Sequence, residues 1–201
     1  MKYEWRKQEK ELYGVKQEAV LVKVPKQKFI KISGKGNPND IDFSNRVSVL
    51  YSLAYAIKKE YKMTATGEVD DFSVYPLEGV WKQKEEEELI KEKLEYTIMI
   101  RQPDFITEDM VSIAMEKVKK KKPNPLFDEV SFDTMEEETC VQILHIGAFD
   151  DEPASFEKMD AYVKECGLKR SSTSHREIYL SNANRVPKNK LKTILRYRVE
   201  K

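Results

Sequence analysis

Glu177 is the residue of this sequence whose neighbours most strongly suggest a role in binding or catalysis. It lies in the run 175–180, His-Arg-Glu-Ile-Tyr-Leu, whose alternation of side-chain types is typical of a β-strand. Alternate side chains of a strand share a face, so His175, Glu177 and Tyr179 are predicted to form one row. A carboxylate inside an apolar sheet costs free energy unless it is paired or hydrogen-bonded, and such a group often binds a cation or transfers a proton. Glu177 is therefore the predicted catalytic residue.

Glu177 also has two simpler interpretations. It would be exposed at a sheet edge, or it would form an ion pair with Arg196 or Arg198 on the next predicted strand. If it is buried without a cationic partner, burial raises the pKa of its carboxyl group. Glu78, which follows the stretch 75–77, is a second candidate carboxylate, and its simpler interpretation is a position at the end of a strand.

Aromatic residues give the second signal. Most of them are expected to fill the core, but a subset that faces one cleft would bind flat apolar molecules by stacking, with tyrosine hydroxyls to orient them. The aromatic residues in or beside predicted elements are Tyr51, Tyr55, Tyr75, Trp81, Tyr96, Phe149, Tyr179 and Tyr197.

No residue pattern predicts a metal or a cofactor. The two histidines, His145 and His175, fall in different predicted strands with no cysteine nearby in the sequence. The Gly-Lys-Gly stretch at 34–36 lacks the third glycine and the Ser or Thr of a phosphate loop. The serines at 171–174 beside His175 lack the pattern of a serine nucleophile. We therefore expect no metal ligands and no cofactor.

The same order of elements occurs twice along the chain. Each half is predicted as strand, helix, strand, strand, which indicates an α+β fold with one antiparallel sheet of about eight strands and helices packed on it. The first half has an extended segment at 20–34, a helix from about 40 to 62, and strands at 72–77 and 96–100, separated by an acidic run at 85–88 that we expect to be solvated. The second half has a strand at 141–147, a helix at 153–166, and strands at 175–180 and 193–199. A connecting helix at about 107–122 and an added strand at 127–132 lie between the halves.

These elements divide the chain into an arm and one domain. Residues 1–18 are the N-terminal arm, whose Tyr3, Trp5, Leu12 and Tyr13 would either dock as a short amphipathic turn or belong to a solvated segment. Residues 19–201 form the domain, with repeat one at about 19–102, the connecting helix at about 107–122 and repeat two at about 127–201.

Composition narrows the class of protein. The 201 residues are 40% hydrophobic and 35% charged, a composition that excludes a disordered chain. The net charge of +1 gives no overall positive potential that would attract nucleic acid or an anionic membrane. Four lysines at 119–122 suit the dipole at the end of the predicted helix; a nucleic-acid patch is the alternative, but no aromatic residues are interleaved. No apolar run approaches the roughly 20 residues of a membrane span, so we expect a soluble, cytoplasmic protein. Cys140 and Cys166 are expected to be reduced core residues.

Three stretches give the chain a family likeness. Residues 75–81 (Tyr-Pro-Leu-Glu-Gly-Val-Trp), residues 145–150 (His-Ile-Gly-Ala-Phe-Asp), and residues 175–180 followed by 193–195 resemble the GyrI-like small-molecule-binding family in order and spacing. The likeness covers about 19–201 and implies a ligand cleft between the two halves, with Glu177 on its floor and aromatic walls. Phe149 departs from the pattern, because the family more often has Tyr there. The candidate ligand-binding residues for this cleft are Tyr55, Trp81, Tyr75, His145, His175, Tyr179 and Tyr197.

The resemblance also implies a specific activity. Some free-standing members that share the 75–81 stretch hydrolyse the strained cyclopropane of DNA-alkylating natural products, and 18 residues before Ala19 are too few for a helix-turn-helix unit. We therefore expect a cofactor-independent hydrolase that recognises and detoxifies hydrophobic or aromatic xenobiotics, with Glu177 taking a proton from water. The alternative is a non-catalytic protein that sequesters drugs or senses a ligand, and gyrase or another protein partner is not expected.

Overall fold

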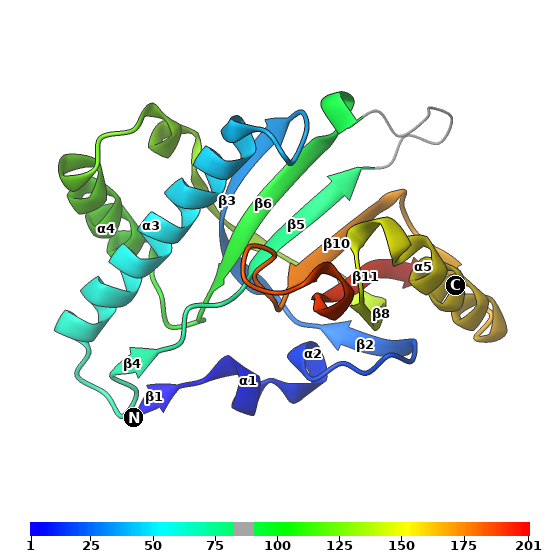
Figure 1. The fold of residues 1–201 in the computed structure, drawn as a ribbon. Helices are drawn as coiled ribbons and strands as arrows, with labels where there is room; N and C mark the ends of the chain where they lie inside the picture. Colours follow the sequence, from blue (N-terminus) through cyan, green and yellow to red (C-terminus); the bar gives the residue numbers. More distant parts are fainter. Residues whose placement is uncertain (83–90) are drawn as a thin grey trace.

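Apart from the short pair β1 and β4, the described strands of the computed structural model form one curled antiparallel sheet (Figure 1). The structure describes residues 1–82 and 91–201, so the acidic run at 85–88 lies outside the described residues. Strands β10 and β5 are neighbours in the middle of the sheet and join the two halves of the chain. In spatial order the sheet is β2 (Val20–Val24), β8 (Glu138–Ile146), β11 (Lys192–Glu200), β10 (Ser174–Tyr179), β5 (Leu77–Lys82), β6 (Glu95–Gln102), β3 (Gln27–Lys35) and β7 (Ser131–Met135).

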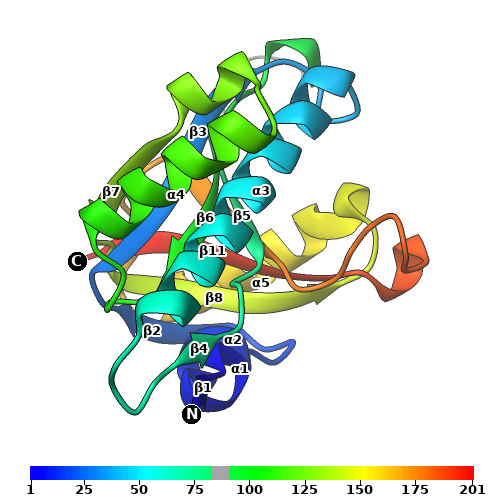
Figure 2. The ribbon, with the colours of Figure 1, turned by 90° about the vertical axis from the view of Figure 1, so that its left-hand side faces the viewer.

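Two helices cover one face of this sheet, one over each half. Helix α3 (Ile41–Thr64) packs on β3 and β6, and α4 (Glu108–Lys121) packs on α3 (Figure 2). Helix α5 (Glu152–Glu165) packs on β8 and β11. The order β3-α3-β5-β6 and then β8-α5-β10-β11 confirms the predicted α+β fold with two strand-helix-strand-strand units. None of the described helices combines the length and apolarity needed to cross a bilayer.

The remaining elements are short. Strand β1 (Lys2–Tyr3) pairs with β4 (Asp71–Phe72), and β9 (Lys169–Arg170) pairs with the end of β11. The N-terminal segment contains α1 (Trp5–Gln8) and α2 (Lys10–Tyr13). The short 3-10 helices are η1 (Lys91–Lys93), η2 (Pro125–Glu129), η3 (Phe149–Asp151) and η4 (Lys188–Lys190).

Side-chain alternation gives the sheet two different faces. We call the face under α3 and α5 the helix face; its isoleucines, such as Ile32 and Ile98, share a core with Leu53 of α3. We call the other the arm face, because residues 1–13 cover it. Gln142 and Arg196 on that face donate to the backbone carbonyls of Glu11 and Leu12. Each strand therefore contributes to two separate environments.

The N-terminal segment is docked rather than solvated. Trp5, Leu12 and Tyr13 are buried, and the indole of Trp5 donates to the carbonyl oxygen of Val74. Arg101 of β6 forms an ion pair with Glu9 between the two short helices. The segment thus closes the arm face of the sheet.

Several element boundaries differ from those predicted. The strand expected at 72–77 is instead β5 at Leu77–Lys82, because Pro76 has no N–H for a central strand and the chain before it turns toward the arm. The extended segment 20–34 is broken at Pro25 into β2 and β3, and the stretch 127–132 begins as a 3-10 turn before β7. Both cysteines are free, but Cys166 is exposed at the end of α5 rather than in the core.

Candidate functional site

Four side chains meet on the helix face at the centre of the sheet. Glu177 on β10 is 8% exposed. Its Oε2 accepts a hydrogen bond of 2.6 Å from the Tyr179 hydroxyl, and its Oε1 accepts one of 2.8 Å from His175 Nε2. The indole of Trp81 on β5 donates to the Tyr179 oxygen at 2.9 Å. The sequence-predicted row on β10 is thus hydrogen-bonded into one unit with Trp81.

Strand pairing explains why Trp81 belongs to this unit. Strands β5 and β10 are antiparallel, with Trp81 opposite His175 and Gly79 opposite Glu177. A Cβ atom at Gly79 would lie 2.7 Å from Trp81 Nε1 and 3.0 Å from the Tyr179 oxygen. Only glycine at this position leaves room for the indole to reach across to Tyr179.

Glu152, at the start of α5, is the functional candidate that sequence reasoning missed. Glu152 is 7% exposed. One oxygen of its carboxyl group, one nitrogen of His175 and one carboxylate oxygen of Glu177 lie within 4.8 Å of one another. Its Oε1 is buried without a hydrogen-bond partner among the described residues. An acidic residue in the first turn of a helix is common because it suits the helix dipole, so its type and position gave no signal of a site.

The two carboxyl groups have opposite pKa shifts. Burial, followed by the charge of Glu177, raises the pKa of Glu152. Burial also acts to raise the pKa of Glu177, but hydrogen bonds from His175, Tyr179 and Glu152 outweigh it, so this pKa is lowered. The rise expected from burial alone is thus present, but the hydrogen bond and electrostatic attraction from His175 reverse the net direction. The opposite shifts of the two pKa values favour a charged Glu177 beside a protonated Glu152.

The same residues bear on metal binding. Glu152, His175 and Glu177 are of the types that bind divalent ions, a set that the sequence spacing did not predict. However, His175 Nε2 donates to Glu177 Oε1, so an ion would compete with this hydrogen bond. The Glu177 carboxylate accepts hydrogen bonds from His175 and Tyr179.

Aromatic side chains surround the unit. Phe149 meets Tyr179 edge-on at 6.0 Å between ring centroids, and Phe156 meets His175 at 4.8 Å. On the other side, Phe43 of α3 stacks on Trp81 at 6.2 Å. Phe149 is 43% exposed, so the unit has one neighbouring ring in contact with solvent. Phe43 and Phe156 were not identified from sequence, because their contacts depend on where the two helices cross the sheet.

The other four predicted ligand-binding residues lie apart from this unit. Tyr75 is buried against the arm, with its ring stacked on Trp5. Tyr197 lies under α5 and donates to Asp160, and His145 contacts Ser155 and the carbonyl oxygen of Ala148. Tyr55 is 58% exposed on α3. Of the predicted set, the structure brings together His175, Glu177, Tyr179 and Trp81.

The simpler interpretations of the two carboxylates are also resolved. Glu177 is neither at an edge nor paired with arginine, because Arg196 donates to Gln142 and Arg198 pairs with Glu138. Glu78 is the second residue of β5, near the start of the strand as the simpler interpretation expects, and it is fully buried on the arm face. It pairs with Arg176 at 3.2 Å, and burial raises its pKa.

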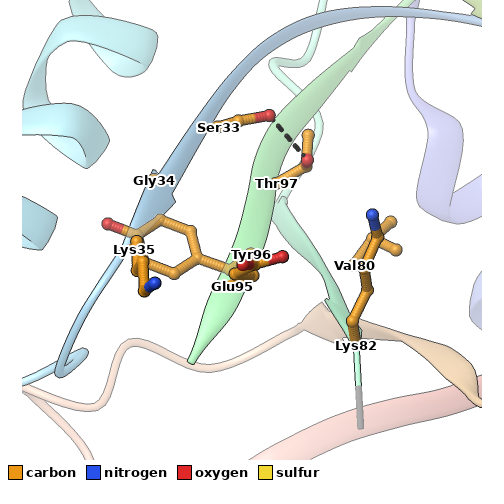
Figure 3. Close-up of a pocket in the computed structure, with 8 residues that line it drawn as sticks. All are labelled: Ser33, Gly34, Lys35, Val80, Lys82, Glu95, Tyr96 and Thr97. Atoms are coloured by element: carbon orange, nitrogen blue, oxygen red, sulfur yellow. Dashed lines mark hydrogen bonds between the residues drawn. The ribbon is translucent and has the colours of Figure 1, made fainter. Parts of the chain in front are cut away.

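Two hollows of the surface lie away from Glu177. One, of about 250 Å³, is lined by strands β3, β5 and β6, where the hydroxyls of Ser33 and Thr97 are 2.8 Å apart (Figure 3). Val80 and Thr97 line it and alternate with Trp81 and Tyr96, so it opens on the arm face. The other, of about 470 Å³, lies between residues 17–19 and α5. Neither is lined by a predicted site residue, so neither is the expected cleft over Glu177.

Comparison with known proteins identifies the class. A family model of the GyrI-like small molecule binding domain matches residues 17–199, so the chain belongs to this family. An uncharacterized conserved protein from Listeria innocua is 35% identical with a TM-score of 0.90, and the match covers 98% of this chain and 100% of that one. A hydrolase from Listeria innocua is 34% identical with a TM-score of 0.90 and full coverage of both chains. A further Listeria innocua hydrolase is 33% identical with a TM-score of 0.88, covering 98% and 100%. No match was found among curated proteins.

Proposed function

We propose that this protein is a hydrolase that opens the strained cyclopropane of DNA-alkylating natural products and so detoxifies them. The observation that carries the proposal is the buried Glu177 carboxylate, which accepts hydrogen bonds from His175 and Tyr179 at the centre of a group of aromatic side chains. The similarity to two Listeria innocua hydrolases at 34% and 33% identity supports hydrolysis as the reaction type.

The proposed reaction adds one water molecule to the ligand. Glu177 accepts a proton from the water, whose oxygen bonds to a cyclopropane carbon while the ring C–C bond breaks. The electron pair of that bond passes through the conjugated system to the carbonyl oxygen, which takes up a proton and becomes a hydroxyl. Ring strain lowers the barrier, so a carboxylate with a modest pKa suffices as base.

Aromatic residues are proposed to hold the flat part of the ligand. Trp81 stacks on it, and Tyr179 orients it through its hydroxyl group. Tyr55 is exposed on α3 and free to contribute a second stacking face. Because Phe149 contacts Tyr179 and is partly exposed, we place ligand entry on that side.

The test is to incubate the protein with a large excess of a cyclopropane-bearing duocarmycin-type compound and to follow the products by mass spectrometry. We expect many equivalents of a ligand-plus-water product. Glu177→Gln should lower turnover about 10²–10⁴-fold with binding retained. Glu157→Gln, the same change at an exposed position of α5, is the control and should have no effect. Undiminished turnover by Glu177→Gln would remove this residue from the mechanism.

Stoichiometric binding without conversion is the second candidate function. The lowered pKa of Glu177 favours it, since a carboxylate that stays ionised also suits a cationic or polar aromatic ligand. A sequestering or sensing protein would bind the compound, leave its mass unchanged and lose affinity in Glu177→Gln. Conversion beyond one equivalent would exclude this function.

A further inference from the structure

Two buried polar atoms of the site, Glu152 Oε1 and His175 Nδ1, have no hydrogen-bond partner among the described residues. Oε1 of Glu152 meets no hydrogen-bond donor among residues 1–82 and 91–201. The carboxyl groups of Glu152 and Glu177 offer oxygen atoms within 4.8 Å of one another, and the two residues are only 7% and 8% exposed. A buried acceptor without a partner loses its hydrogen bonds to water and gains none in the fold, which destabilises the folded state. The contact between the two carboxyl groups therefore requires either a proton or a cation.

A proton fits this contact better than a cation does. The Glu177 carboxylate already accepts from the His175 nitrogen and from the Tyr179 hydroxyl, so its negative charge is stabilised. A proton on Glu152 makes it a third donor to Glu177 and removes the repulsion between two like charges. A cation would compete with His175 for Glu177 Oε1. The contacts thus assign the charge to Glu177 and the proton to Glu152.

We propose that Glu152 is the proton donor of this site: its carboxyl group carries a proton at neutral pH and delivers it to the carbonyl oxygen of the bound ligand. The delivery step rests on the proposed hydrolysis, whereas the protonated state does not. Glu152 gives its proton to the oxygen that receives the electrons of the broken C–C bond. Glu177 takes a proton from the attacking water. Transfer of this proton from Glu177 to the adjacent Glu152 then restores the pair.

The charged and titratable neighbours of Glu152 agree with this assignment. Glu177, His175 and Tyr179 face it from β10, and Asp150 faces it from the turn before α5. Burial and the negative charges of Glu177 and Asp150 raise the pKa of Glu152. The pKa of Tyr179 is also raised, so its hydroxyl stays protonated beside Glu177.

Infrared spectroscopy tests the protonated state without a substrate. The ordinary pKa of a glutamate is 4.5, so a protonated-carboxyl C=O band near neutral pH reports a group whose pKa is raised. We expect such a band in the wild type and in Glu157→Gln, and its loss in Glu152→Gln. The difference between variants is needed because the buried Glu78 also has a raised pKa. In Glu177→Gln, which removes the neighbouring charge, the band should disappear at a lower pH.

Two infrared results would overturn the proposal. One is a neutral-pH spectrum in which Glu152→Gln and the wild type have the same protonated-carboxyl intensity. The other is a chelator-treated wild type that lacks the band and binds one equivalent of Zn²⁺, since a cation would then fill the contact. If Glu152→Gln does not fold, the band is compared between the wild type and Glu177→Gln. Disappearance of the band at the same pH in both proteins would then overturn the proposal.

Turnover tests the delivery step. With the duocarmycin-type compound, Glu152→Gln should lower kcat about 10²–10⁴-fold and retain binding. The wild-type rate should fall as alkaline pH removes the Glu152 proton, and the residual rate of the variant should lack this decline. Full turnover by Glu152→Gln would overturn the donor role. A wild type that shows the band and never converts the compound would instead overturn the proposed hydrolysis while establishing the protonated Glu152.

Discussion

Gly79 lies directly opposite Glu177 in the β5–β10 pair, and it leaves the space through which Trp81 reaches Tyr179. The Trp81 indole donates to Tyr179, which in turn donates to Glu177. The hydrogen bonds of the candidate base therefore depend on the smallest residue of the stretch 75–81. This relationship gives that stretch a structural meaning independent of any family likeness.

Gly79→Ala should separate Trp81 from Tyr179. The added methyl group would approach the Trp81 nitrogen to 2.7 Å, so the indole must shift, and we expect a loss of about 1–3 kcal/mol of stability from overpacking. Turnover should fall more than the folded fraction does. Denaturant unfolding and the mass-spectrometric assay measure the two effects. Gly67→Ala is the control, because a Cβ there meets open space; similar losses in both variants would contradict the role of Gly79.

Arg176 should be far more important for stability than an exposed arginine of the same sheet. It is fully buried and pairs with Glu78, so Arg176→Ala leaves a buried carboxylate uncompensated, at a cost of about 3–5 kcal/mol. Arg198→Ala removes a pair that is about half exposed and should cost at most about 1 kcal/mol. Chemical denaturation compares the variants directly. Equal costs would show that Glu78 finds another partner or takes up a proton.

The pH dependence of stability should reveal Glu152. The pKa of Glu152 in the folded state is raised above its ordinary value of 4.5. At a pH between 4.5 and the raised pKa, Glu152 holds a proton in the folded protein and releases it on unfolding. The free energy of unfolding therefore decreases as the pH rises through this range. Glu177 has a lowered pKa and contributes the opposite slope, but only in acid, as pH falls below 4.5. We expect the unfolding free energy of the wild type to decrease from about pH 6 to about pH 9 more steeply than that of Glu152→Gln. Parallel profiles would contradict the shift.

The N-terminal segment should be a structural part of the domain. Trp5 is 4% exposed and stacks on Tyr75, so Trp5→Ala should destabilise the fold by about 3–5 kcal/mol. Lys7→Ala, which removes only an exposed pair with Glu4, should change stability by less than about 1 kcal/mol. Thermal unfolding followed by near-ultraviolet circular dichroism measures both variants. An unchanged Trp5→Ala would mean that this segment packs only weakly on the sheet.

Local patterns predicted the fold well but only part of the site. The alternation in 175–180 gave β10 and its row of polar side chains, because strand periodicity is a local property. Trp81 joins them through the pairing of β5 with β10, which local patterns did not predict because the strand was expected at 72–77; Trp81 was selected from the family likeness. Glu152 is adjacent only because α5 begins above β10, and no pattern along the chain encodes that crossing. Tyr75 and Tyr197 were assigned by type, yet each is held elsewhere by its own acidic partner, Glu9 or Asp160.

Opposite charges on consecutive residues of β10 also protect its alignment. Arg176 meets Glu78 and Glu137 on the arm face, while Glu177 meets hydrogen-bond donors on the helix face. A slip of one residue would exchange these environments. Glu177 would then meet two other glutamates, and the guanidinium of Arg176 would lose both carboxylates. A shifted register of β10 would therefore lose favourable contacts on both faces of the sheet. This free-energy difference favours the register that places Glu177, the candidate base, on the helix face.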